Sequence, residues 1–289
     1  MVPFREALHS GRILLMDGAM GTELQRAGIA AGACPESWNL DHPDRVHAIH
    51  KAYVDAGAQC LLTNTFQANE MALTRHGLAD KLEAIVQAAL DLARAAAGPD
   101  RLVIGDIGPV GPLEPTAVRR LIEALRSADA LLLETWSDVK AAESFLKIVK
   151  AQSSGGLPVL LSFTYGRSAS TSDFHTFKGY PPESCALAAK ECGADALGVN
   201  CGRDLGMEDM AAILRRYRSV TDLPLFARPN AGTPARVAEC WTYPHTAEDM
   251  AARLPELLDA GATMIGGCCG TTPATIAAFR RVVEKGTSG

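Results

Sequence analysis

The sequence predicts an α/β fold, a (β/α)₈ TIM barrel formed by a single domain that spans residues 1–289. Short apolar runs alternate with amphipathic segments eight times along the chain. The runs are apolar at successive positions, which is typical of parallel strands that are buried on both faces. Eight strand–helix units of this kind favour a closed barrel over the alternative, a doubly wound open sheet.

The eight predicted strands share one pattern, a short apolar run that ends in polar or glycine residues. The apolar runs cover residues 13–19, 59–66, 102–107, 130–135, 159–165, 196–201, 225–228 and 263–268. In a barrel, functional groups gather at the carboxyl ends of the strands. The polar residues that end these runs are therefore the candidates for a site.

Amphipathic segments with helical spacing lie between the predicted strands. The predicted helices cover residues 43–56, 78–97, 116–127, 138–152, 182–192, 207–219, 247–260 and 273–285. Three of them are followed by Gly57, Gly193 and Gly261, and a glycine just past the last helical residue commonly ends a helix. The regular alternation supports one continuous domain without a linker.

Three longer irregular stretches, residues 25–42, 166–180 and 230–246, follow the first, fifth and seventh predicted strands. Segments that follow the strands of a barrel lie on its catalytic face. Residues 166–172 are a candidate lid over a site there, and a passive loop is the alternative.

Composition limits the classes of partner. Hydrophobic residues make up 47% of the chain and charged residues 21%, which is ordinary for a globular protein. The net charge of −5, without a basic cluster, argues against nucleic acid or a membrane surface as a partner. The N-terminus lacks a signal-peptide pattern, and no apolar run could span a bilayer. We therefore expect a cytoplasmic protein whose eight cysteines are thiols or metal ligands.

Three cysteines follow predicted strands and share glycine-rich surroundings. Cys201 ends the sixth run, and Cys268 and Cys269 end the eighth, between Gly267 and Gly270. Three thiolates at strand ends, with one position left open, are the ligand pattern of catalytic zinc. The alternatives are simple burial of the thiols, or a disulfide, which a reducing compartment disfavours.

The motifs at the strand ends resemble those of the homocysteine S-methyltransferase family. That family includes the homocysteine domain of cobalamin-dependent methionine synthase and betaine–homocysteine methyltransferase. The matching stretches are DGAMGT at 17–22, NTF at 64–66, ET at 134–135, VNC at 199–201, PNAG at 229–232 and GGCCGTTP at 266–273. The resemblance covers nearly the whole chain and implies the same barrel.

The resemblance implies a zinc-dependent methyltransferase. Its zinc ligands and catalytic residues fall on Cys201, Cys268 and Cys269. The enzyme would move a methyl group from an activated donor to the thiol of homocysteine and release methionine, through a zinc-bound homocysteine thiolate. Asn200 is expected to contact homocysteine, and Asn230 is a possible fourth zinc ligand when substrate is absent.

The amino-acid head of homocysteine requires an acceptor for its ammonium and donors for its carboxylate. Asp17 and Glu134 are expected to accept from the ammonium. The backbone amides of Gly18, Ala19 and Met20 are expected to cradle the carboxylate, because successive amides at a glycine corner form an anion site.

The methyl donor stays open between methylcobalamin on a separate corrinoid protein, S-methylmethionine and betaine. No cobalamin or folate domain fits within 289 residues beside a barrel. Trp38 and Trp136 could contribute to the aromatic site that a quaternary ammonium prefers. The alternative functions are a betaine- or other onium-specific thiol methyltransferase, and a non-catalytic or redox thiol protein.

Overall fold

A computed structural model describes residues 3–111, 114–152, 156–168, 173–237 and 240–286. Its main sheet has eight parallel strands in the order β1-β12-β9-β8-β5-β4-β3-β2. The strands are β1 (Leu14–Leu15), β2 (Cys60–Leu62), β3 (Leu102–Ile107), β4 (Ala130–Trp136), β5 (Val159–Phe163), β8 (Ala196–Asn200), β9 (Leu225–Arg228) and β12 (Ala262–Ile265). The predicted TIM barrel is confirmed, and each strand lies within or next to its predicted run.

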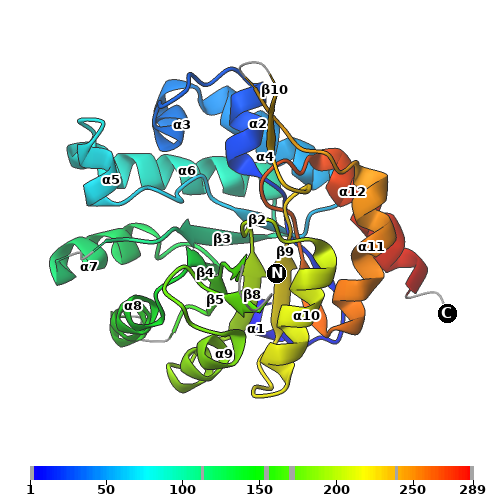
Figure 1. Ribbon diagram of the computed structural model, residues 1–289. Coiled ribbons are helices and arrows are strands. Elements are labelled where there is room, and N and C mark those ends of the chain that lie inside the picture. Colours follow the sequence, from blue (N-terminus) through cyan, green and yellow to red (C-terminus); the bar gives the residue numbers. More distant parts are fainter. Residues whose placement is uncertain (1–2, 112–113, 153–155, 169–172, 238–239, 287–289) are drawn as a thin grey trace.

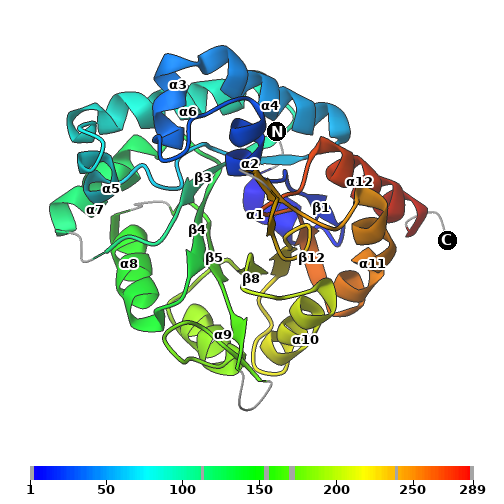
Figure 2. The same cartoon turned by 45° about the horizontal axis from the view of Figure 1, so that its top comes forward.

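The first and last strands of this order close the barrel. Met16 pairs with Cys60 in a parallel bridge between β1 and β2. The amide of Gln59 donates to the carbonyl of Leu15 at 2.7 Å, and the amide of Asp17 donates to the carbonyl of Cys60 at 2.9 Å. The ring of strands and the surrounding ring of helices are visible in Figure 2.

Among the described residues, eight longer helices form the outer layer, and each overlaps a predicted helix. Their arrangement around the strands is visible in Figure 1. They are α4 (Pro43–Ala56), α6 (Leu82–Ala97), α7 (Pro115–Ala124), α8 (Val139–Gln152), α9 (Pro182–Glu191), α10 (Met207–Arg218), α11 (Ala247–Asp259) and α12 (Pro273–Gly286). The helix predicted at 78–97 begins with a separate short turn, η2 (Ala79–Lys81), before α6. Shorter helices that the sequence did not indicate are α1 (Phe4–Leu8), α2 (Met20–Arg26), η1 (Pro35–Ser37), α3 (Trp38–Asp41) and α5 (Glu70–Thr74).

The three stretches predicted to be irregular contain short elements. Helices η1 and α3 occupy part of 25–42. The other two stretches contain antiparallel pairs, β6 (Gly166–Arg167) with β7 (Phe174–His175), and β10 (Ala235–Val237) with β11 (Cys240–Thr242). The candidate lid at 166–172 lies partly outside the described residues, which omit 169–172.

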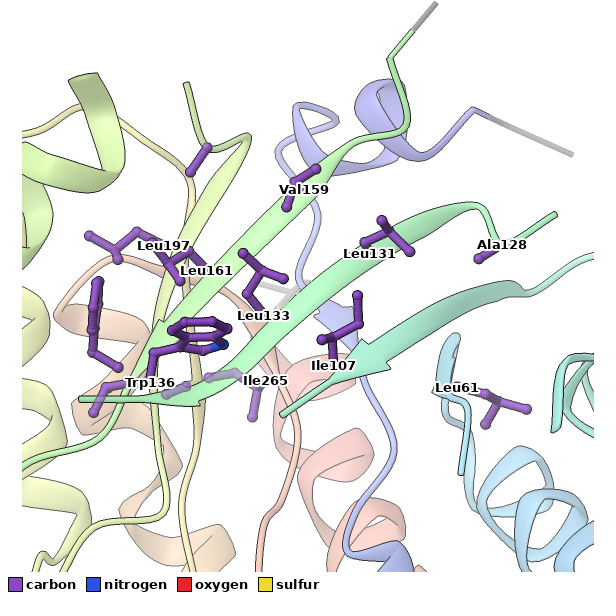
Figure 3. Close-up of a cluster of buried hydrophobic side chains, with 14 of the residues drawn as sticks. Leu61, Ile107, Ala128, Leu131, Leu133, Trp136, Val159, Leu161, Leu197 and Ile265 are labelled. Carbon is purple, nitrogen blue, oxygen red and sulfur yellow. The ribbon is translucent and has the colours of Figure 1, made fainter. Parts of the chain in front are cut away.

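Two apolar layers form the core, because successive side chains of a strand point to opposite sides. On β4, Leu131 and Leu133 pack outward against the helices, together with Leu161 of β5 (Figure 3). The inner layer contains alternate residues of all eight strands, and it includes Ala130 and Leu132 of β4. Phe4 and Leu8 of α1 belong to the inner layer and seal one end of the barrel.

No helix in the described part of the chain is long and apolar enough to cross a membrane.

Candidate active site

A cavity of about 380 Å³ lies at the carboxyl ends of the strands. Its walls come from the carboxyl ends of β2, β3, β4 and β9, from residues that follow β1, β2, β8 and β12, from η1 and from the start of α2. The lining residues are Asp17, Gly18, Ala19, Met20, Gly21, Thr22, Pro35, Glu36, Leu62, Thr63, Phe66, Gln67, Asp106, Glu134, Thr135, Cys201, Arg228, Cys268 and Cys269. The cavity therefore stands where a barrel builds its active site.

The alternation of the strands aims three charged side chains into the barrel. Asp106, Glu134 and Arg228 each stand two residues beyond an apolar residue of the inner layer, on β3, β4 and β9. All three residues are buried. The apolar filling of the barrel thus ends in a charged layer that forms the floor of the cavity.

Three cysteine sulfurs meet in the cavity. The Sγ atoms of Cys201, Cys268 and Cys269 all lie within 4.8 Å of one another, and those of Cys268 and Cys269 are 4.0 Å apart. Tetrahedral zinc with Zn–S bonds of about 2.3 Å holds its sulfurs about 3.8 Å apart. The donor set and its spacing therefore fit a zinc ion with one position left for another ligand.

The backbone around the cysteine pair depends on glycine. Gly270 has φ +81°, and a Cβ atom there would lie 2.1 Å from the ring of Tyr243. A Cβ atom on Gly267 would lie 2.3 Å from the hydroxyl of Thr271. The amide of Cys268 donates to the carbonyl of Pro229 at 2.8 Å, which ties this turn to the end of β9. The turn thus brings two adjacent thiols to one side.

The three thiols do not hold their protons equally. The pKa of Cys201 falls to about 3, because the thiols of Cys268 and Cys269 donate hydrogen bonds to its sulfur. The same bonds raise the pKa of Cys268 to about 12 and raise the pKa of Cys269. Asn230 Nδ2 also donates to the Cys201 sulfur at 3.6 Å. One thiolate is therefore already favoured, and binding of a metal would displace protons from the other two thiols.

The charged layer is organised around Arg228. Its guanidinium forms ion pairs with Glu134 and, at 3.3 Å, with Asp17 Oδ1. It also donates to the carbonyl of Gly18 at 3.2 Å. The other oxygen of Asp17 accepts the amide of Leu62 at 2.8 Å. Burial raises the pKa of Asp17 and of Glu134 to about 7, and Arg228 opposes the rise.

With this geometry established, comparison with known proteins assigns the chain. The model of the homocysteine S-methyltransferase family matches residues 14–283. The chain belongs to this family.

Relatives of this family cover the chain almost completely. It is 31% identical to homocysteine S-methyltransferase of Escherichia coli over 96% of this chain and 97% of that protein. It is 31% identical to methionine synthase of Mycobacterium tuberculosis over 92% of this chain, but the chain spans only 24% of that protein. The metallated form of the homocysteine methyltransferase MmuM from Escherichia coli superposes with a TM-score of 0.79 and 29% identity, over 96% of this chain and 99% of that one.

These relationships confirm the family, the barrel and the enzyme class that the sequence predicted, a homocysteine S-methyltransferase. The three cysteines of the family's motifs meet as expected and form a group able to hold a metal ion.

Asn200 lies behind the cavity wall and does not line the cavity. It is fully buried, and its Oδ1 accepts from the amide of Thr135 at 3.1 Å and from the hydroxyl of Ser162. Its Nδ2 donates to the hydroxyl of Thr135 at 2.7 Å. Thr135 has φ +64°, an unusual value for a β-branched residue. Asn200 thus holds Thr135, a strained residue of the cavity wall, in place.

The predicted cradle for the carboxylate is only partly available. The amide of Ala19 donates to the hydroxyl of Thr271 at 3.1 Å and is therefore engaged within the protein. Helix α2 begins at Met20, and Met20, Gly21 and Thr22 line the cavity with its first turn. This turn therefore lies at the cavity beside the Gly18–Ala19 corner.

Sequence reasoning missed Arg228 and Asp106 as site residues. Arg228 is the last residue of β9 and Asp106 the last but one of β3, and a charged residue near the end of an apolar run was the available signal. Glu36 was also missed. It enters the cavity from η1, where its carboxylate accepts the amide of Gln67 at 2.7 Å.

Proposed function

We propose that this chain transfers a methyl group from an activated donor to the thiol of homocysteine and releases methionine. The observation that carries the proposal is one cavity lined by three clustered cysteine sulfurs and by buried carboxylates. Homocysteine carries the matching groups, a thiol at one end and an ammonium at the other. Residues 1–289 act in this proposal as one homocysteine-binding domain in the cytoplasm.

The chain's own residues orient the amino acid. The buried carboxylates of Glu134 and Asp17 line the cavity and provide the negative surroundings that an ammonium requires. The first turn of α2, from Met20, faces the cavity with amides that suit the substrate carboxylate. Held at this end, the substrate directs its thiol toward Cys201 and the cysteine pair.

In this proposal, Cys201, Cys268 and Cys269 hold Zn²⁺. Zinc would supply a Lewis acid that lowers the pKa of the homocysteine thiol and leaves it nucleophilic at neutral pH. Asn230 is the candidate for the fourth ligand without substrate, because its Nδ2 lies 3.6 Å from the Cys201 sulfur and its Oδ1 is buried without a hydrogen-bond partner in the described structure.

The donor is proposed as a class, an activated methyl carried by a corrinoid protein, S-methylmethionine or betaine. Trp38 and Trp136 are buried and do not line the cavity. Phe66 is the aromatic side chain among the described lining residues. The tryptophan-based onium site considered from the sequence therefore gains no support.

A donor screen tests the function. Zinc-loaded protein is incubated with homocysteine and with methylcobalamin, S-methylmethionine or betaine in turn, and methionine is measured. Methionine formation with one donor, abolished by Cys201→Ala, is the expected result. Stoichiometric zinc distinguishes the enzyme from a redox thiol protein. The absence of homocysteine binding and of turnover with every donor would refute the proposal.

A further inference from the structure

Asp17 contributes negative charge to the cavity, but both of its carboxylate oxygens already have partners within the protein. Its Oδ1 faces Arg228 at 3.3 Å, and its Oδ2 accepts the amide of Leu62 at 2.8 Å. The carboxylate is only 2% exposed. Glu134 uses Oε1 for the ion pair with Arg228 and keeps Oε2 outside that pair. An ammonium in the cavity therefore needs an acceptor besides Glu134.

Asp106 is the carboxylate that meets this need. It lines the cavity from the end of β3, and its Oδ1 is buried without a hydrogen-bond partner among the described residues. Two hydrogen bonds fix the backbone of Asp106. Its amide donates to the hydroxyl of Thr63 at 3.0 Å, and its carbonyl accepts from the hydroxyl of Thr65 at 2.6 Å. A rigid strand end thus presents an unsatisfied oxygen.

Asp106 and Glu134 lie on neighbouring strands. Strands β3 and β4 run side by side (Figure 2). In their parallel register, Asp106 pairs with Leu132. Glu134 follows Leu132 by two residues and so points to the same side. The two carboxylates are diagonal neighbours on the inner face of the barrel, and one small cation can approach both.

The charges of the layer are unbalanced. Asp17, Asp106 and Glu134 face a single buried cation in the described cavity, Arg228. Burial of this cluster raises the pKa of Asp106 well above its usual range. Buried charge is costly without a partner. A ligand that brings one positive charge would relieve this cost.

We propose that Asp106, together with Glu134, receives the ammonium of the substrate and makes the enzyme specific for thiols that carry an α-amino group. Arg228 then acts as a fixed counter-ion that positions Asp17 and Glu134. This inference rests on the proposed function, because it names the residue that selects the substrate at that same site.

The test compares two thiols that differ only in the amino group, homocysteine and 4-sulfanylbutanoate. Their affinities for the zinc-loaded protein are measured by calorimetry. Loss of a hydrogen bond to a charged group costs about 1.5–3 kcal/mol. Asp106→Asn should therefore weaken homocysteine about 10- to 100-fold. It should change the affinity for 4-sulfanylbutanoate less than about threefold and leave the zinc content unchanged.

Asp91→Asn is the matched control, since it makes the same change at an exposed position of α6, outside the cavity. There the carboxylate accepts only from the side chain of Gln87, at 2.8 Å, among the described contacts. It should not alter the ratio of the two affinities. Asp106→Ser, a smaller replacement, provides a second variant if Asp106→Asn does not fold.

Two results would overturn the inference. One is an unchanged homocysteine affinity in both Asp106 variants. The other is an equal loss for both thiols, which would mean a merely structural role. Failure of the proposed function would look different, because the parent protein itself would then neither bind homocysteine nor form methionine.

Discussion

One buried guanidinium sets the arrangement of charge in the cavity. Arg228 is 3% exposed, and it is held by Glu134, Asp17 and the carbonyl of Gly18. Removing one partner of a buried ion pair is strongly destabilising, because the remaining charge stays desolvated. Arg228 thus couples the strand ends of β1, β4 and β9, and a change at any of its partners reaches the others.

Glu134→Gln should weaken homocysteine binding about 10- to 100-fold and leave zinc binding intact. The physical reason is the loss of a charge-assisted hydrogen bond to the ammonium, about 1.5–3 kcal/mol. Calorimetry gives the homocysteine affinity, and atomic absorption gives the zinc content of the same sample. Homocysteine binding equal to that of the parent would contradict the role of Glu134.

Cys201→Ala should abolish the binding of about one zinc ion per chain. Its sulfur lies within 4.8 Å of both others, so its removal leaves two ligands of three. Cys192, on the outer side of the barrel after α9, supplies the control, and Cys192→Ala should keep full zinc. Zinc content after dialysis decides the matter, and full occupancy in Cys201→Ala would show that the ligand set is wrong.

For single residues, the cluster of three cysteines was predictable from the sequence, and the charged layer was not. Cys201 and the Cys268-Cys269 pair carry an unusual residue type between glycines, which leaves few interpretations. Arg228 and Asp106 lie at or next to the ends of their strands, and in the sequence a charge at such a position looks the same whether it points to solvent or into the barrel. The closed sheet decides the direction, and only the pairing of strands reveals it.

Among the elements, the strands of the barrel were predictable because burial on both faces leaves an uninterrupted apolar run. The small elements were not. Strands β6 and β7 have two residues each, and α1 has five. Segments this short cannot repeat the alternation of a strand or the 3.6-residue period of a helix, so the sequence carries no pattern for them. Helix α1 is stabilised by Phe4 and Leu8 in the end of the barrel, which is a tertiary contact.

Helix α4 carries a histidine that makes the fold sensitive to acid. His50 is fully buried beside Val46 and Tyr53 on the inner face of α4, and neither ring nitrogen has a hydrogen-bond partner in the described part of the chain. Burial lowers its pKa to about 3. Between pH 6.5 and 3 the unfolded chain binds a proton that the folded chain does not, so stability falls as the pH falls.

His50→Leu should therefore reduce the stability that is lost between pH 7 and pH 5 by about 2 kcal/mol. Urea unfolding at the two pH values gives the free energies, and only the difference between variant and parent is used. His9 is exposed, and His9→Gln should behave as the parent does. An identical loss in His50→Leu and the parent would refute the argument.

In the whole molecule, the apolar core and the candidate active site occupy different parts of the barrel. The inner layer, filled by alternate residues of all eight strands, is sealed by α1 at one end. The cysteines and the charged layer lie at the opposite end, where the strands end and the turns that follow them begin. Burying one large aliphatic side chain contributes about 1.5–3 kcal/mol. A core of this extent therefore does not depend on the metal, unlike small domains that fold only with zinc.

Removal of zinc by a chelator should accordingly leave the barrel folded. The far-ultraviolet circular dichroism spectrum should not change, while the melting temperature falls, because a ligand that binds only the folded state stabilises it by mass action. Cys201→Ala provides the control, since its melting temperature should equal that of the chelated parent and should not respond to chelator. Loss of the helical signal on chelation would instead show that the three-thiol site holds the fold together, and the separation of core and site would then be wrong.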